Sequence, residues 1–207
     1  MAQSSRRWGL RVTALVVAVG AALFSVAPAA SAATTATVGC TQRTVSQKFL
    51  KVDGDTNYYF TAPGGTFESG APGWSLTNTR IGWGWGNERY YVNGPGHSTS
   101  LFVNSGGKAV SPVFCNQLGE GSLRFFVRGS AGARVHLHID ATSNTGGNVS
   151  TVDWEMTVPS NGDWKAPNGI QVPYLYEGNY ENLQVSFTAI SGWVMVDDVE
   201  IDPWRSL

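Results

Sequence analysis

The chain has 207 residues, with 14 lysines and arginines against 15 acidic residues and a net charge of −1 at pH 7. A mildly acidic chain without a basic run argues against nucleic acid and against anionic membranes as partners. Its two cysteines form neither a CxxC motif nor a Cys/His metal spacing, which argues against a zinc-finger type of centre.

The first 32 residues have the layout of a secretory signal peptide. Positive residues precede an apolar stretch at 12–27, and a small-residue cleavage motif ends at Ala32. The positive residues are Arg6, Arg7 and Arg11. The apolar stretch falls short of the roughly 20 residues of a membrane span. We therefore expect a secreted, extracellular protein. Export by the general secretory route is one alternative; the twin-arginine route is the other, because Arg6 and Arg7 partly match the twin-arginine motif.

The remainder, about 175 residues, is one domain by length. Residues 33–62 are interpreted as an N-terminal extension that packs on the domain or is tethered to it. The segment 89–112 contains three strand-like runs cut by Gly, Pro, Asn and Ser. Further runs rich in β-branched and aromatic residues lie at 122–129, 134–141, 148–158, 182–190 and 193–202. No stretch keeps a helical apolar period, so the sequence predicts an all-β fold, an antiparallel β-sandwich or barrel.

The run 134–140 shows the clearest alternation. Val135, Leu137 and Ile139 share one face. The other face is polar and carries Arg134, His136, His138 and Asp140. Two histidines at this spacing can share a zinc or copper ion if a neighbouring strand supplies a third ligand. A solvated sheet face or contact with a sugar explains the same pattern without a metal, and we favour these interpretations.

Aromatic residues are concentrated among turn residues. Trp83 and Trp85 alternate with glycines, and Tyr174 and Tyr176 lie in a loop-like stretch. Flat rings with a polar edge suit the apolar faces of sugars, so these four are candidate ligand contacts. The alternative is that they are buried. Three other tryptophans are expected in the core, namely Trp74, Trp154 and Trp193.

Catalytic chemistry has no clear motif in this chain. A GxSxG elbow, an HExxH motif, a Walker sequence and a GxGxxG followed by a helix are all missing from the sequence. The acidic residues are scattered, and a sequence does not show the carboxylate separations that a glycosidase needs. An enzyme is therefore the less favoured interpretation.

Cys40 and Cys115 are expected to form a disulfide, because export permits one and two cysteines allow a single pairing. The alternative is two separate buried thiols. The enclosed loop would contribute roughly 4 kcal/mol in the chain-entropy model.

Two segments resemble calcium-containing jelly-roll carbohydrate-binding modules, which have a galactose-binding-like fold. Residues 63–76 resemble the opening strand of these modules, with Phe67 and Glu68 followed by Trp74, and 192–203 resemble the closing strand. The intervening 111–115 and 123–128 resemble secreted actinobacterial-type proteins of unassigned function. The resemblance covers 63–203 and implies a jelly-roll β-sandwich over 63–207.

The same resemblance implies a structural calcium held by the carboxylates of Glu68 and Asp197 and by backbone carbonyls near Thr66. Calcium prefers hard oxygen ligands. Asp197 alternates with Met195, Val199 and Ile201, which predicts that it points inward, where a carboxylate needs a partner. A hydrogen-bonded Asp197 without an ion is the alternative.

These observations favour a secreted, non-catalytic protein that resembles a carbohydrate-binding module and binds an extracellular glycan by stacking and hydrogen bonds. The alternative is an extracellular structural or protein-interaction sandwich without a glycan site. A small glycan-active enzyme is the third hypothesis.

Overall fold

The computed structural model describes residues 40, 44–46, 59–83, 88, 92, 94–117, 120–145, 147–173, 175 and 180–202. These residues form strands and no helix, as predicted, and the strand pairs are antiparallel. In chain order the strands are β1 (Thr44–Ser46), β2 (Tyr59–Thr61), β3 (Ser75–Trp83), β4 (Thr99–Val110), β5 (Phe114–Gln117), β6 (Ser122–Gly129), β7 (Arg134–Ser143), β8 (Val149–Thr157), β9 (Ile170–Gln171), β10 (Tyr180–Ser191) and β11 (Val194–Asp202). The described residues include no helix that is long and apolar enough to cross a membrane.

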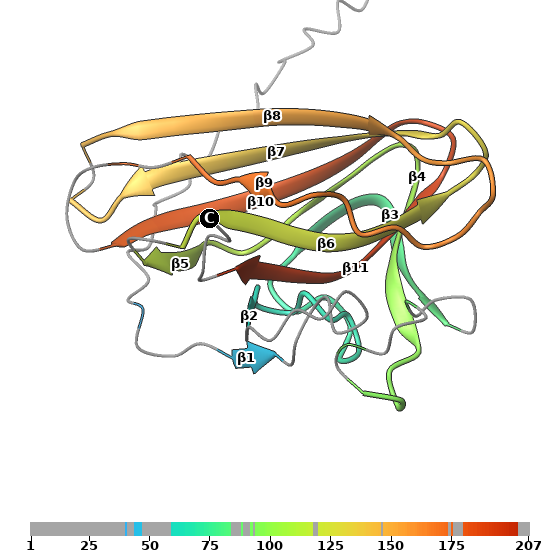
Figure 1. Ribbon diagram of the computed structural model, residues 1–207, viewed down its shortest axis with the longest axis horizontal. Coiled ribbons are helices and arrows are strands. Elements are labelled where there is room, and N and C mark those ends of the chain that lie inside the picture. The colour runs from blue at the N-terminus through green and yellow to red at the C-terminus, as the bar shows by residue number, and fades with distance from the viewer. Residues whose placement is uncertain are drawn as a thin grey trace, which may run out of the picture. The chain divides into compact units, whose positions relative to one another are not determined.

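The strands form two layers that share β4 (Figure 1). In one layer β8 pairs with β7, β7 with β10, and β10 with both β5 and the C-terminal part of β4. In the other layer β11 pairs with β6, with β2 and with the N-terminal part of β4, while β9 extends β6. This is the antiparallel β-sandwich that the sequence predicted.

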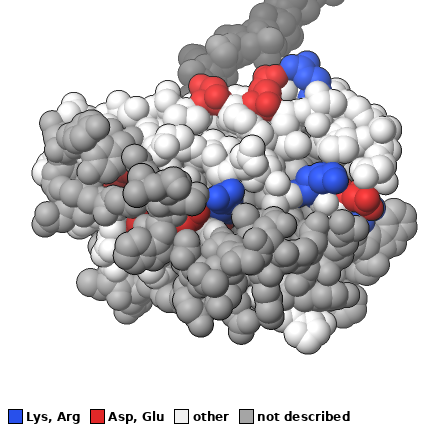
Figure 2. All heavy atoms as spheres, in the orientation of Figure 1, with Lys and Arg blue, Asp and Glu red and all other residues white. Residues whose placement is uncertain are grey.

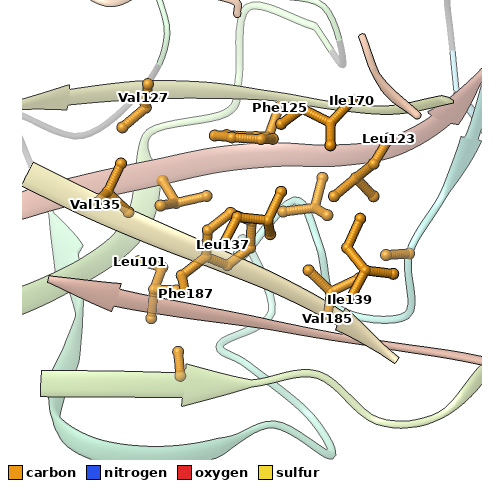
Figure 3. Close-up of a cluster of buried hydrophobic side chains, with 14 of the residues drawn as sticks. Leu101, Leu123, Phe125, Val127, Val135, Leu137, Ile139, Ile170, Val185 and Phe187 are labelled. Carbon is orange, nitrogen blue, oxygen red and sulfur yellow. The ribbon is translucent and has the colours of Figure 1, made fainter. Parts of the chain in front are cut away.

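The main core lies between the two layers. The alternating residues Val135, Leu137 and Ile139 of β7 are fully buried and point toward the apolar face of β6 (Figure 3). Phe125 of β6 meets Phe187 of β10 edge to face, with ring centroids 5.0 Å apart. Burying each such side chain stabilises the fold by about 1.5–3 kcal/mol, which fixes the polar alternates of β7 on the outer side of their layer.

A second, smaller core covers the outer side of the β6–β11 layer. It contains Tyr59, Val92, Phe126, Trp164 and Met195. As a result β11 is buried along its whole length on both faces. The β8–β7–β10 layer, by contrast, keeps a polar side that is accessible to solvent along β7 and β8.

Trp74 is a core residue, as predicted. Its side chain is 8% exposed, lies edge to face with Phe67 at 5.2 Å and donates a 2.8 Å hydrogen bond to the carbonyl of Pro63. Trp154 and Trp193 are only half-buried, and they pack at the margins of the two cores. The prediction that these two are core residues therefore holds in part.

Of the three runs predicted within 89–112, the first lies largely outside the described residues, and the other two belong to one strand. Residues 99–110 form the single strand β4, which continues through Gly106 and Gly107. Gly106 has a φ of 72°, and a Cβ on Gly107 would lie 2.5 Å from the carbonyl oxygen of Asn78. The glycines thus form a bulge opposite Asn78, where the β3 register shifts, instead of ending a strand.

A second bulge changes the predicted face of β11. The pairing with β6 shifts register between Asp197 and Glu200, and Asp198 has a φ of 45°. Met195 consequently belongs to the second core, while Val199 and Ile201 belong to the main core. Asp197 is buried, as expected, but the prediction that all four alternate on one face is wrong, because the bulge inserts an extra residue after Asp197.

Cys40 and Cys115 form the predicted disulfide, with Cα atoms 5.2 Å apart. This separation lies within the roughly 4.4–6.8 Å that a disulfide requires. The bond links the segment before β1 to β5.

Candidate functional site

The hairpin of β7 and β8 brings polar side chains into register on the outer side of its layer. His138 is paired with Asp153, and His136 with Glu155. On β8 each outward residue is exposed and each inward residue is half-buried. Since side chains alternate strictly along a strand, the buried Leu137 and Ile139 oblige the histidines between and beside them to face outward.

The same surface continues across β10. Thr188 is paired with His136, Ser186 with His138, and Gln184 with Asp140. We call the whole surface the polar face; its members are Arg134, His136, His138, Asp140, Thr142, Thr151, Asp153, Glu155, Gln184, Ser186 and Thr188. In Figure 2 acidic and basic groups stand together along the upper edge of the molecule, over β8.

Four side chains of the polar face form a hydrogen-bonded cluster. Oδ1 of Asp153 lies 2.8 Å from Nε2 of His136 and 2.8 Å from Nδ1 of His138. Nε2 of His138 lies 3.1 Å from Oδ1 of Asp140. Arg134 pairs with Glu155 at 2.5 Å beside them. The cluster therefore joins two strands by charge-assisted contacts.

The cluster perturbs the titration of two of its members. The hydrogen bond that His138 donates to Asp153 is the largest influence that raises the pKa of His138 above its ordinary 6.5, against a smaller opposing influence of burial, and Asp140 adds to the increase. The hydrogen bond from His138 lowers the pKa of Asp153 below its ordinary 3.8. Both shifts favour the ion pair, as expected for opposite charges in contact.

A metal ion is not supported at the histidines. A third potential ligand, Asp153, does come from the neighbouring strand, but the described residues contain no group of three His, Cys, Asp or Glu side chains placed to hold a metal. Here Asp153 satisfies the two rings by hydrogen bonds instead.

A surface pocket of about 160 Å³ opens next to the cluster, lined by residues of β7, β8 and β10 and by Val113, which precedes β5. It is smaller than the roughly 300–1,000 Å³ of pockets that enclose drug-sized ligands, so it suits one small polar unit of a larger ligand. Its lining combines apolar and hydrogen-bonding groups, namely Val113, Asp140, Thr142, Val149, Asn182, Leu183 and Gln184. Such a lining matches the mixed apolar and hydroxyl surface of a sugar.

The side chains of the four predicted aromatic contacts are not among those that the structure describes. Trp85, Tyr174 and Tyr176 are outside the described residues, as is the side chain of Trp83. The backbone of Trp83 pairs with Thr99 at the start of β4, whereas β10 pairs with the opposite end of β4. Arg134, His136, His138 and Asp140 are brought together as the alternation indicated.

Glu68 and Asp197, the predicted calcium ligands, lie at the same end of β4. Oε1 of Glu68 accepts hydrogen bonds from the backbone N–H groups of Ser98 and Thr99, at 2.8 and 2.7 Å. Asp197 follows Val196, which pairs with Leu101 of β4. Asp197 accepts hydrogen bonds from its neighbour Asp198 and, at 3.2 Å, from the N–H of Glu88.

The oxygen donors around Glu68 and Asp197 are of the type that calcium prefers. Two carboxylates supply only part of a coordination shell, so backbone carbonyls would have to supply much of the rest. Carboxylate and carbonyl oxygens are the ligands that calcium prefers, and it takes six to eight of them. The described residues include no group of three or more His, Cys, Asp or Glu side chains placed to hold a metal, here as at the histidines. Burial, with the neighbouring Asp198 and Glu88 carboxylates, raises the pKa of Asp197 well above its ordinary value.

Sequence reasoning missed Asp153 and the pocket residues of β10. A signal for Asp153 was present, because Gly146 and Gly147 mark a turn between the runs 134–141 and 148–158. Counting outward from that turn pairs Asp153 with His138. The pocket residues of β10 reach the site through the pairing of β10 with β7, which joins segments far apart in sequence and cannot be predicted from a local pattern.

No protein-family model matches the chain, and no curated protein matches it. Among solved structures, the chain is similar to TmCBM61 in complex with β-1,4-galactotriose, with 19% identity and a TM-score of 0.42 over 67% of this chain and 94% of that one. It is also similar to a family 11 carbohydrate-binding module from Clostridium thermocellum in complex with a mixed-linked tetrasaccharide, with 15% identity, a TM-score of 0.42, and coverage of 66% and 91%. A third is the CBM22-2 xylan-binding domain of Paenibacillus barcinonensis Xyn10C, with 16% identity, a TM-score of 0.43, and coverage of 66% and 96%. At these identities the likeness concerns the β-sandwich fold alone.

Proposed function

We propose that this is a secreted, non-catalytic protein that binds an extracellular glycan on its polar face. The observation that carries the proposal is the pocket beside Asp140, where apolar side chains alternate with a carboxylate, a hydroxyl and two amides. Sugars present apolar C–H patches and hydroxyl groups together, so a lining of this kind can satisfy both. The pocket would hold one sugar unit, and the polar face from His138 to Arg134 would accompany the neighbouring units.

Stacking on aromatic rings is the second part of the proposal, and the position of the described residue Leu175 supports one pair of candidates. Leu175, between Tyr174 and Tyr176 in sequence, donates its N–H to Oε2 of Glu181 at 3.1 Å. Glu181 lies at the end of β10 that pairs with β5, the same end as the pocket residue Asn182, although its own side chain faces inward. We therefore assign the stacking role to Tyr174 and Tyr176 before Trp83 and Trp85.

The test is calorimetric titration of the mature protein with hexamers of xylose, glucose, N-acetylglucosamine and galacturonic acid, and pull-down with insoluble polysaccharides. Asp140→Ala is expected to weaken binding by about 1.5–3 kcal/mol, the range for a hydrogen bond to a charged group. Asp163→Ala, which removes an exposed carboxylate from the loop after β8, is the matched control and should bind like the parent.

A second comparison tests the stacking assignment. Tyr176→Ala should weaken binding by about 1–3 kcal/mol, as for the loss of a well-packed anchor, and Trp83→Ala should weaken it less. Failure of every glycan to bind the parent protein would overturn the proposal and favour a protein-interaction role for the polar face.

We also propose that a structural calcium ion binds at Glu68 and Asp197, with backbone carbonyls completing its shell. Bound there, the ion would supply positive charge that links the turn at Glu68 to β11. The support is the shared position of the two carboxylates at the start of β4.

A further inference from the structure

His138 contacts a carboxylate with each of its ring nitrogens. Nδ1 lies 2.8 Å from Asp153 and Nε2 lies 3.1 Å from Asp140. A neutral imidazole carries only one N–H and must present a lone pair at its other nitrogen, whereas the imidazolium donates from both. The observed geometry therefore satisfies both contacts only when His138 is protonated.

Loss of that proton affects the two carboxylates unequally. Asp153 is the closer partner and also contacts His136, so the single remaining N–H is expected to stay with Asp153. The lone pair on Nε2 then faces the Asp140 carboxylate, which it repels. Asp140 also lines the pocket and is the one charged residue of its described lining.

The other groups around His138 do not replace its charge. Its own strand contributes His136 and, farther along, Arg134, whose guanidinium pairs with Glu155 of β8. β10 presents only uncharged groups, namely Gln184, Ser186 and Thr188. Lys108 of β4 lies beyond Thr188 and pairs in register with it, and is separated from His138 by the width of β10.

We propose that His138 sets the charge preference of the pocket: protonated, it neutralises Asp140, and neutral, it leaves Asp140 as an uncompensated carboxylate that accepts sugar hydroxyls and repels anionic sugars. This inference rests on the proposed glycan function and names its regulation. The pocket then prefers neutral over carboxylated sugar units, and the preference increases as the pH rises through the pKa of His138. Ligand and proton binding are reciprocal, so a neutral ligand that uses Asp140 also lowers the pKa of His138.

Two measurements test this on the mature protein. The first is an NMR titration of the histidine rings, in which the pKa of His138 should lie above 6.5 and fall in both Asp140→Asn and Asp153→Asn. An unchanged pKa in Asp140→Asn would overturn the coupling without any ligand being needed.

The second measurement is the ratio of affinities for xylohexaose and for the galacturonic acid hexamer at pH 5.5 and pH 8. The ratio should increase with pH by about fivefold or more in the parent, at the low end of coupling between sites, and stay constant in His138→Gln. His97→Gln, which replaces a histidine in the 94–98 turn, is the matched control and should keep the increase. Binding of both hexamers with a constant ratio in the parent would overturn this inference and leave glycan binding standing, whereas no binding at either pH would overturn the proposed function itself.

Discussion

Oε1 of Glu181 on β10 accepts a 2.6 Å hydrogen bond from Nδ2 of Asn116 on β5. Both side chains are buried, and Asn116 also donates to the carbonyl of Glu120. Glu181 thus holds together the corner of the sandwich next to the disulfide, and its other carboxylate oxygen accepts a hydrogen bond from the N–H of Leu175.

Glu181→Ala is expected to lower the free energy of unfolding by about 2–4 kcal/mol, because the N–H of Leu175 loses the acceptor seen here and Asn116 keeps only the carbonyl of Glu120, and a buried donor left without its partner costs about 1–3 kcal/mol. Urea denaturation measures the change. Glu155→Ala, which removes an exposed carboxylate, is the control and should cost at most about 1 kcal/mol. An equal effect of the two substitutions would contradict the role given to Glu181.

The buried Glu181 should also make the stability of the fold depend on pH. Burial raises its pKa above the ordinary 4.5, so its folded form prefers the proton. The resulting stability is present below pH 4.5 and is lost as the pH rises through the raised pKa. The cost of Glu181→Ala should therefore be smaller at pH 7 than at pH 4, and denaturation curves at the two values check the sign.

The disulfide prediction concerns stability as well as connectivity. The bond closes a loop between residues 75 apart in sequence, which in the chain-entropy model stabilises the fold by roughly 4 kcal/mol. The double variant Cys40→Ser/Cys115→Ser should lower the free energy of unfolding by about 2–5 kcal/mol. Adding dithiothreitol should lower the melting temperature of the parent and leave the double variant unaffected, and free thiols in the untreated protein would refute the pairing.

The calcium proposal is tested with a chelator. A ligand present at about 100 times its dissociation constant stabilises a fold by about 2.7 kcal/mol. EDTA should accordingly lower the melting temperature of the parent, and excess calcium should restore it. Asp197→Asn should lose this response. A melting temperature that does not change with EDTA, together with no metal in elemental analysis, would rule the ion out.

The ion pair of His138 and Asp153 is expected to stabilise the fold only within a limited range of pH. The lowered pKa of Asp153 gives stability that is present above 3.8 and lost as the pH falls through its folded value. The raised pKa of His138 gives stability that is present below 6.5 and lost as the pH rises through its folded value. The difference in unfolding free energy between the parent and Asp153→Asn should peak between these limits, and a difference that is independent of pH would contradict the pairing.

Local pattern was sufficient for much of the layer that carries the site. The strict alternation of 134–140 predicted β7 and its two faces, because burial of every second residue is a property of the strand itself. The predicted polar quartet of Arg134, His136, His138 and Asp140 is indeed on one surface.

Features that depend on distant backbone could not be predicted in this way. The bulge at Asp198 is stabilised by backbone hydrogen bonds between Gly65 and Val199 and between Ala62 and Val199. A Cβ on Gly65 would lie 2.8 Å from the carbonyl of Val199, which shows how closely the two segments approach. No pattern within 193–202 contains that contact, so the simple alternation placed Val199 and Ile201 on the same face as Met195 and Asp197, from which the bulge separates them.

The passage of β4 through both layers has a consequence for unfolding. Its residues 101–103 pair with β11 and its residues 108–110 pair with β10. The two layers cannot separate from each other as intact sheets, because β4 would first have to lose its backbone hydrogen bonds to either β10 or β11. The sandwich is therefore expected to unfold as a single cooperative unit, and the amide protons of β4 should be among the slowest to exchange with deuterated solvent, at a rate set by global opening.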